Sequence, residues 1–236
     1  MGNYIVEMHL HTLGNSSCGH TAPADIMALY SEAGYDGIVC TNHFNRYIYE
    51  EYLEGSTEKE KLAHFFRAFN ELKAYKEENG GPDVFFGVEV AIGKDDYHLK
   101  TNFDCAEILV YGITPEEFAE HAAEITETDY AGLRRIADEN GWLLYQAHPF
   151  RERTKRLKRK YLDGIEIYNA NPRHANFNFL AALKARTQNL KVVAGSDFHK
   201  PHDIGAAVIF ARRPSNEKEL AALLRAGEYS VMRRKP

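Results

Sequence analysis

Two pairs of possible metal ligands lie near opposite ends of the sequence. His9 and His11 follow the apolar run 4–8, and Asp197 and His199 follow the run 191–194. Residues i and i+2 of a strand share a face, so each pair can direct two side chains at one point. Imidazole nitrogens and carboxylate oxygens are ligands for first-row divalent metals, and the sequence indicates no competing soft-sulfur site. The spacing predicts a metal centre of the kind that hydrolases use.

Other polar residues recur where predicted strands end. We predict strands at 37–41, 84–90, 108–111, 142–146, 165–168, 191–194 and 207–210. Helices are predicted after Thr21, from Ser56 or Thr57 to Asn79, and over 130–140 and 172–187. The polar residues at or just after the strand ends are Asn42, His43, Glu89, Gln146, His148, Asn169 and Asn171. Because these residues all occur at strand ends, we expect them to lie near one another in the fold.

Strands and helices alternate seven or eight times, which is typical of an α/β protein with parallel strands. No glycine-rich phosphate loop follows the first strand, so a closed barrel is favoured over an open doubly wound sheet. Barrel enzymes build their sites at the C-terminal mouth of the strands. We therefore expect the polar residues to surround one mouth.

The composition predicts a single domain over residues 1–236, since 44% hydrophobic residues can form a substantial core. A net charge of −5 and a pI near 6.1 argue against general affinity for nucleic acid or membranes. The three cysteines show no metal-finger or redox spacing, so a disulfide framework is not expected. Together with the lack of a signal-peptide pattern, this predicts a cytoplasmic protein. The oligomeric state stays open.

Five ordered motifs closely resemble those of the PHP superfamily, named for polymerase and histidinol phosphatase. They are His9-Leu10-His11-Thr12, Thr41-Asn42-His43, Gly87-Val88-Glu89, Ala147-His148-Pro149 and Gly195-Ser196-Asp197-Phe198-His199. One such motif would mean little, whereas five in order make coincidence improbable. Two further strings, Ser17–His20 and Gly164–Asn169, resemble a bacterial stand-alone subgroup.

The resemblance implies a distorted (β/α)7 TIM-like barrel holding two or three zinc, manganese or iron ions. It implies that His9, His11, Glu89 and Asp197 bind one ion, and that Glu89 bridges to a second ion also bound by His148. His20, His43 and His199 would bind a third. The family usually supplies another histidine near the fourth strand; here Glu107 is a possible substitute, and His98 is a weaker one.

The expected chemistry needs no protein nucleophile. Two divalent ions about 4 Å apart lower the pKa of a shared water enough to give a bridging hydroxide near neutral pH. Asp197 is then both a ligand and a proton acceptor, and His199 or His20 protonates the leaving oxygen. Arg151, Arg173 and Lys200 are placed to bind the substrate phosphate.

The favoured function is hydrolysis of a phosphate monoester of a small metabolite, with chemistry like that of histidinol phosphatase and no stable nucleic-acid or membrane partner. A phosphodiesterase or exonuclease is the main alternative, because residues 151–160 contain seven basic side chains. A phosphotyrosine phosphatase is a third possibility. An amidohydrolase-type site is a minor one, since it typically needs a bridging lysine where this chain has Glu89.

Two glutamates have plain structural alternatives. Glu89 interrupts an apolar strand, where it could form a salt bridge, although the neighbouring histidines favour metal ligation. Glu166 lies in the middle of a strand, where it could point outward or pair with a basic side chain.

Overall fold

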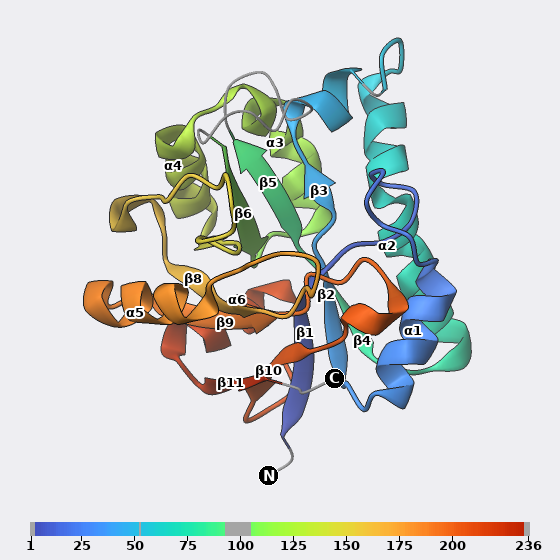
Figure 1. Ribbon diagram of the computed structural model, residues 1–236. Coiled ribbons are helices and arrows are strands. Elements are labelled where there is room, and N and C mark those ends of the chain that lie inside the picture. Colours follow the sequence, from blue (N-terminus) through green and yellow to red (C-terminus); the bar gives the residue numbers. More distant parts are fainter. Residues whose placement is uncertain (1–2, 52, 93–104, 234–236) are drawn as a thin grey trace.

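The computed structural model describes residues 3–51, 53–92 and 105–233, which form a mixed α/β fold with two sheets (Figure 1). One sheet has the order β11-β10-β1-β2-β4 and the other has the order β3-β5-β6-β7-β8-β9. The strands of the first are β1 (Tyr4–Leu10), β2 (Gly37–Cys40), β4 (Asp83–Phe86), β10 (Ala206–Phe210) and β11 (Tyr229–Arg233). Those of the second are β3 (His43–Phe44), β5 (Val88–Ile92), β6 (Ala106–Tyr111), β7 (Leu143–Gln146), β8 (Gly164–Asn169) and β9 (Lys191–Gly195). The predicted strands are thus present, except that the single strand predicted at 84–90 is two strands, β4 and β5, which belong to different sheets.

The two sheets are hydrogen-bonded to each other at two seams. At one seam the Glu89 N–H donates to the Asn42 carbonyl (3.1 Å), which continues the pairing of β2 with β4. At the other, the His11 N–H donates to the Phe198 carbonyl (2.9 Å) and the Phe198 N–H to the His9 carbonyl (3.1 Å). The pairings define two sheets within the described residues, so closure into a barrel stays a prediction.

The expectation that all strands run parallel is wrong. β6 is antiparallel to both β5 and β7, and β10 is antiparallel to β1 and β11. The alternation of apolar runs and helices fixes the order of elements but not the direction of each strand. Because β6 is reversed, its first residues lie beside the last residues of its neighbours, with Glu107 opposite Ala91 and Ile108 opposite Gln146.

Six α-helices cover the sheets in the described part of the chain: α1 (Pro23–Glu32), α2 (Glu58–Asn79), α3 (Pro115–Glu127), α4 (Tyr130–Asn140), α5 (Asn178–Gln188) and α6 (Glu217–Ala226). Thr57 begins α2 with a capping box to Glu60, which confirms the predicted start. The helix predicted from 172 begins only at Asn178. Before it, the side chains of Asn171 and Asn176 hydrogen-bond locally and hold a loop.

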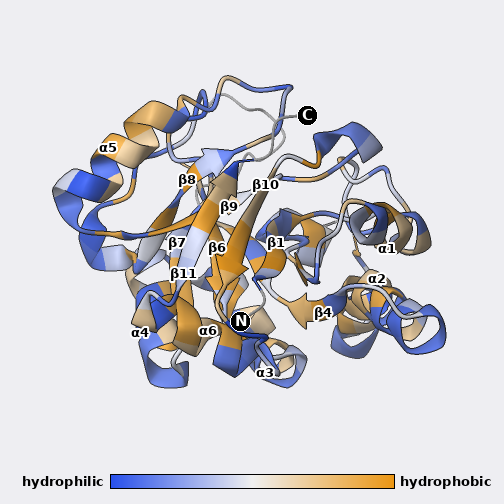
Figure 2. Ribbon diagram, turned by 90° about the horizontal axis from the view of Figure 1, so that it is seen from below, coloured by the Kyte–Doolittle hydropathy of each residue, from blue (hydrophilic) through white to orange (hydrophobic). Residues whose placement is uncertain are grey.

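The strands inside are largely hydrophobic, whereas the surrounding helices contain both hydrophobic and hydrophilic residues (Figure 2). Among the described helices, none combines the length and apolar character that crossing a membrane would require. One side of the core is an aromatic cluster, which consists of Phe44, Phe65, Phe66, Phe69, Phe86 and Phe118. This packing fixes β3, which also carries His43.

Candidate metal centre

The end of β1 brings two histidines into the interior. His9 and His11 are at most 1% exposed, and their ring centroids are 5.0 Å apart. The backbone of this segment is held by the seam to Phe198 and by Glu7, whose Oε1 accepts the His9 N–H at 2.9 Å. The sequence prediction that both rings share one face of the strand agrees with this geometry.

Glu89 lies among four imidazoles from four segments of the chain. Its carboxylate oxygens are 3.2 Å from His9 Nε2, 3.3 Å from His11 Nε2, 2.8 Å from His43 Nδ1 and 3.3 Å from His148 Nε2. The residue is fully buried. The ion-pair partners of Glu89 among the described residues are therefore histidines, whereas the alternative of a structural salt bridge would suit an arginine or lysine.

Asp197 is the second carboxylate that joins the cluster. Its Oδ1 is 3.6 Å from His9 Nε2 and 3.4 Å from both His11 Nε2 and His199 Nδ1. Asp197 and His148 have positive φ values of 51° and 24°. A left-handed backbone at a non-glycine residue is strained, and such strain is typical of functional sites.

Glu107, the second residue of the reversed strand β6, reaches the same cluster. Its Oε2 is 3.2 Å from His148 Nε2, and its Oε1 is 3.8 Å from His43 Nδ1. The structure thus places a carboxylate where the family was expected to supply a histidine. The alternative candidate, His98, lies outside the described residues.

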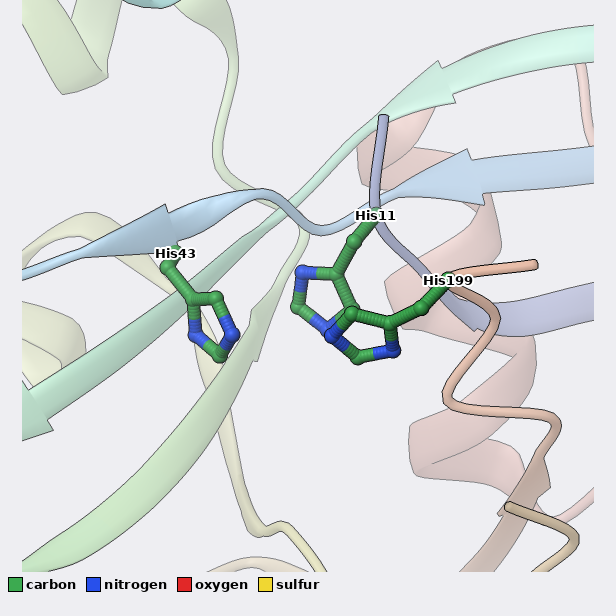
Figure 3. A group of neighbouring side chains, drawn as sticks. All are labelled: His11, His43 and His199. Atoms are coloured by element: carbon green, nitrogen blue, oxygen red, sulfur yellow. The ribbon is translucent and has the colours of Figure 1, made fainter. Parts of the chain in front are cut away.

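A third group consists of His11, His43 and His199, whose rings point toward one another (Figure 3). Their ligand nitrogens lie within 4.8 Å of one another. His20, predicted as a further ligand and proton donor, has an exposed side chain and belongs to no ligand group among the described residues. Only its backbone approaches the site, where the His20 N–H donates to the His199 carbonyl at 3.0 Å.

Glu166 and Glu7 support the cluster from behind. Glu166 is 1% exposed; its Oε1 accepts from His9 Nδ1 at 3.1 Å and its Oε2 accepts from the His148 N–H at 2.9 Å. Of the two simple expectations for Glu166, outward orientation is wrong, whereas pairing with a basic side chain is met by the His9 imidazole. A carboxylate bonded to the second nitrogen of a ligating histidine fixes the tautomer and leaves the other nitrogen for a metal.

The side chains fit a set of cations. Within the described residues, several buried atoms of the cluster have no partner in hydrogen-bonding geometry. They include both carboxylate oxygens of Glu89, His9 Nε2 and both ring nitrogens of His11. Orphaned polar atoms in a buried site are costly unless a ligand or ion satisfies them. The donors are the nitrogen and oxygen types that first-row divalent metals prefer.

The charges of the cluster lead to the same conclusion. Burial would raise the pKa of Glu89, but His9 and His43 hold it well below its usual range. Burial would lower the pKa of His9, but Glu89, Asp197 and Glu166 raise it well above its ordinary value. For His11, burial, His43 and His199 together lower the pKa. Ionised Glu89 and neutral His11 are the forms that metal ligands take, whereas His9 would have to release a proton on binding an ion.

Comparisons with known proteins agree with the motifs and the geometry. A family model described as PHP-associated matches residues 175–229. A two-domain protein from Bacteroides vulgatus, which contains a predicted PHP-like metal-dependent phosphoesterase, has the same fold, with a TM-score of 0.65, 14% identity and 98% of this chain covered. The motifs, the family model and the fold are thus all similar to those of PHP-like proteins. It spans 65% of the length of the Bacteroides protein.

Two other solved structures have a similar fold. A candidate metal-dependent phosphoesterase from Bifidobacterium adolescentis aligns with a TM-score of 0.50 and 15% identity over 93% of this chain and 96% of its own. An amidohydrolase from Chromobacterium violaceum, with bound sulfate and no metal, aligns with a TM-score of 0.54 and 15% identity over 97% of both chains. No curated protein matches the sequence. At these identities the structural matches establish the fold.

The residues predicted to bind phosphate lie at different depths, with Arg151 partly buried and Arg173 and Lys200 exposed. The guanidinium of Arg151 bonds to Asp197 Oδ2 and also donates to Asn169 Oδ1 and Asn176 Oδ1. Arg173 lies farther out and pairs with Asp203 (2.6 Å), and the Lys200 side chain is exposed. Of the three, the structure joins only Arg151 directly to a predicted metal ligand.

Cys18 is a residue near the centre that the sequence did not indicate. Its sulfur lies 2.8 Å from Ser16 Oγ, and it belongs to no ligand group among the described residues. Burial raises the pKa of the Cys18 thiol, but His199 and His43 outweigh burial and lower the pKa to about 5. A single cysteine in a loop has no partner at finger spacing that would single it out in the sequence.

Proposed function

We propose that this protein is a metal-dependent phosphoesterase that hydrolyses a phosphate monoester of a small metabolite. The observation that carries the proposal is the buried Glu89 carboxylate, which lies within 3.3 Å of imidazole nitrogens of four histidines. Such a carboxylate can bridge two cations, and adjacent cations suit phosphoryl transfer. The likeness to PHP-like phosphoesterases supports this reaction class over others.

The side chains proposed to hold two or three zinc, manganese or iron ions are His9, His11, His43, Glu89, Glu107, His148, Asp197 and His199. When bound, such ions neutralise phosphoryl charge and acidify water. We also infer that seven strands close into the distorted barrel, an inference supported by hydrogen bonds at both seams between the sheets.

The protein groups around this centre have distinct proposed roles. Burial opposes a low pKa for Asp197, but Arg151 and His9 hold it well below its usual range, which suits a ligand better than a proton acceptor. His199 donates from Nδ1 to the Asp197 carbonyl (2.8 Å), so its Nε2 is directed elsewhere, to a metal or a leaving oxygen. The exposed His20 is then the proposed proton donor to the leaving oxygen rather than a ligand.

Arg151 is the strongest proposed phosphate ligand, because its guanidinium already contacts the centre through Asp197 and presents several donors in a fixed plane. Arg173 and Lys200 would act at longer range. Substituting Arg151 should raise KM for a phosphate ester while metal content stays normal. Unchanged kinetics would remove Arg151 from the substrate site.

The test combines elemental analysis with hydrolysis of p-nitrophenyl phosphate and bis-(p-nitrophenyl) phosphate. We expect two or three bound ions and monoester hydrolysis in the unmodified protein, and loss of both in a His9→Ala, His11→Ala variant. His121→Ala is the matched control, since His121 pairs with Glu124 on α3 outside the centre. A protein that binds metal yet hydrolyses neither compound would contradict the phosphoesterase proposal while sparing the metal centre.

One observation favours a second candidate, a phosphodiesterase or exonuclease acting on nucleotides or short single strands. Basic side chains after β7 are exposed, namely Arg156, Lys158, Arg159 and Lys160. Positive surface beside an active site attracts polyanions in a salt-dependent way. Faster hydrolysis of the diester, with a strong decrease of kcat/KM in salt, would favour this candidate; activity on phosphotyrosine would favour the third.

A further inference from the structure

The guanidinium of Arg151 is held by three acceptors of the protein. Its Nε donates to Asn176 Oδ1 (3.0 Å), and its Nη2 donates to Asn169 Oδ1 (3.2 Å) and to the Asp197 carboxylate. The side chain is 15% exposed. In the described part of the chain, these bonds use two of the three guanidinium nitrogens and leave Nη1 for a further acceptor. A planar group held at two corners presents its third corner in a fixed direction.

The amides of Asn169 and Asn176 are buried, at 2% and 7% exposed, and each has one possible orientation. Asn176 Nδ2 donates to three oxygens: Asn169 Oδ1 (3.0 Å), the Asn169 carbonyl (3.3 Å) and the Asn171 carbonyl (3.2 Å). Asn169 Nδ2 likewise donates to Glu166 Oε2 (2.9 Å). A reversed amide would turn an oxygen toward these acceptors. Both Oδ1 atoms must therefore face Arg151.

Asp197 joins this arrangement to the metal centre through its two different oxygens. Oδ1 is the oxygen that lies nearest the histidines of the centre. Oδ2 instead accepts hydrogen bonds from Arg151 and from Asn169 (3.3 Å). The guanidinium is therefore fixed on the second oxygen of a predicted metal ligand, which leaves the first oxygen to face the cations.

We propose that Asn169 and Asn176 are positioning residues that act through Arg151, by fixing its guanidinium so that Nη1 donates to an oxygen of the substrate phosphate. Both amides are neutral, so they orient the guanidinium without cancelling its charge, as a second carboxylate would. The inference rests on the proposed function only in taking a phosphate group as the ligand of Arg151. It does not require that the bound phosphate be hydrolysed.

Asn176 is the better of the two residues to change, because its side chain contacts Arg151 without contacting a proposed metal ligand. In the described part of the chain, its hydrogen bonds go to Arg151, Asn169 and Asn171. Asn176→Ala should therefore weaken phosphate binding and leave metal content unchanged. Asn140→Ala is the matched control, at a half-buried asparagine whose side chain bonds to the backbone of its own helix, α4.

Titration calorimetry with inorganic phosphate tests the proposal without any turnover. We expect Asn176→Ala to raise the dissociation constant by about 10- to 100-fold, because a hydrogen bond to a charged group is lost and that group is no longer held in place. In an Arg151→Ala background, Asn176→Ala should have no further effect, since nothing is left to position. The kcat/KM for p-nitrophenyl phosphate should follow the same pattern, mainly through KM.

Arg151→Lys provides a second variant that leaves both asparagines in place. Lysine keeps the positive charge but lacks the planar group that the two amides hold. We expect phosphate affinity to fall about as far as in Arg151→Ala. Near-normal affinity in Arg151→Lys would show that charge without fixed orientation is sufficient, and would overturn the proposal.

The double variant separates positioning from a general effect on the loop. A further loss of affinity in Arg151→Ala, as large as Asn176→Ala causes alone, would overturn the proposal, and so would normal phosphate affinity in Asn176→Ala. An unmodified protein that binds no phosphate would also overturn it. The full expected pattern in a protein that hydrolyses neither p-nitrophenyl compound would support the inference and contradict the proposed function.

Discussion

The two residues of β3 point into different parts of the interior, one apolar and one polar. Phe44 points into the aromatic cluster, where its ring centroid lies 4.8 Å from that of Phe118 and 5.4 Å from that of Phe65. His43 enters the metal centre, where its Nδ1 lies 2.8 Å from Glu89. Aromatic rings at these separations interact favourably and need no further partner. The histidines and carboxylates do not, because several of their buried atoms have no hydrogen-bond partner within the described residues.

Within this short strand, one residue therefore contributes to folding stability and the other to metal binding. The aromatic cluster stabilises the fold without any added component, through burial of apolar surface and ring contacts. The metal centre has a desolvation cost that only cations can offset fully. Substitutions in the aromatic cluster should therefore change folding and leave metal binding intact, and those in the metal centre should do the reverse.

The largest expected effect is on the stability of the aromatic cluster. Phe118 on α3 is fully buried, so Phe118→Ala should lower the free energy of unfolding by about 3–5 kcal/mol. Urea denaturation checks this value, and elemental analysis should show unchanged metal content. Phe179→Ala, at a residue 68% exposed on α5, should change stability by less than about 0.5 kcal/mol. Loss of metal from the folded Phe118→Ala variant would show that metal binding is not independent of the aromatic cluster.

The complementary change removes the central carboxylate of the metal centre. Glu89→Gln should reduce monoester hydrolysis by about 10²- to 10³-fold or more, because a neutral amide cannot bridge cations. Metal content should fall, while circular dichroism should show a folded protein. The exposed Glu228→Gln is the control for the same chemical change. Retained metal and activity would show that Glu89 is structural.

Behind the centre, Glu7 should make folding stability pH-dependent. Burial raises its pKa to about 7, although hydrogen bonds from Ser196, His9 and Tyr30 oppose the rise. The folded chain then keeps this proton up to about pH 7, whereas the unfolded chain loses it near the ordinary pKa of 4.5. The contribution of Glu7 is therefore largest below pH 4.5 and declines as pH rises to 7, by about 3 kcal/mol at most.

Glu7→Gln should remove this decline, since an amide does not titrate. Urea unfolding of both proteins in chelator, at pH 5 and pH 8, measures the difference. Relative to the unmodified protein, the variant should be more stable at pH 8 than at pH 5. Parallel pH profiles would show that Glu7 titrates alike in the folded and unfolded chain.

The smallest expected effect is on metal affinity through Glu166. Glu166→Gln weakens the carboxylate contact that orients His9 Nδ1, and should lower the affinity of one ion by about 10- to 100-fold. Competition with a chelating dye measures this change, and stability should change little. An unaltered affinity would place Glu166 with the structural residues and would narrow the metal centre to its direct ligands.

Much of this molecule could be predicted from the sequence. The spacing of His9 and His11 in an apolar run, and the capping signal at Thr57, depend on local periodicities that the fold preserves. The ordered motifs led to the superfamily. The positions of His43, Glu89, His148, Asp197 and His199 at strand ends also predicted that they meet.

What could not be predicted depends on direction and on loop shape. The reversal of β6, which brings Glu107 to the centre, leaves no trace in a pattern of apolar runs. The loop after β1 includes a close approach of Gly19 to the Thr12 carbonyl, and the burial of Glu166 depends on neighbours distant in sequence. These features arise from tertiary contacts, which local spacing does not encode.

The seam between β1 and the segment after β9 has a consequence for the order of events during synthesis. His9 and His11 are made first, but Asp197 and His199 emerge from the ribosome only after most of the chain. Contacts between such distant segments form late and slowly, because the whole intervening chain must be ordered first. The nascent protein would thus expose isolated histidines before it has a complete binding site. An ion that needs ligands from both segments could then bind only after the C-terminal segment has been made.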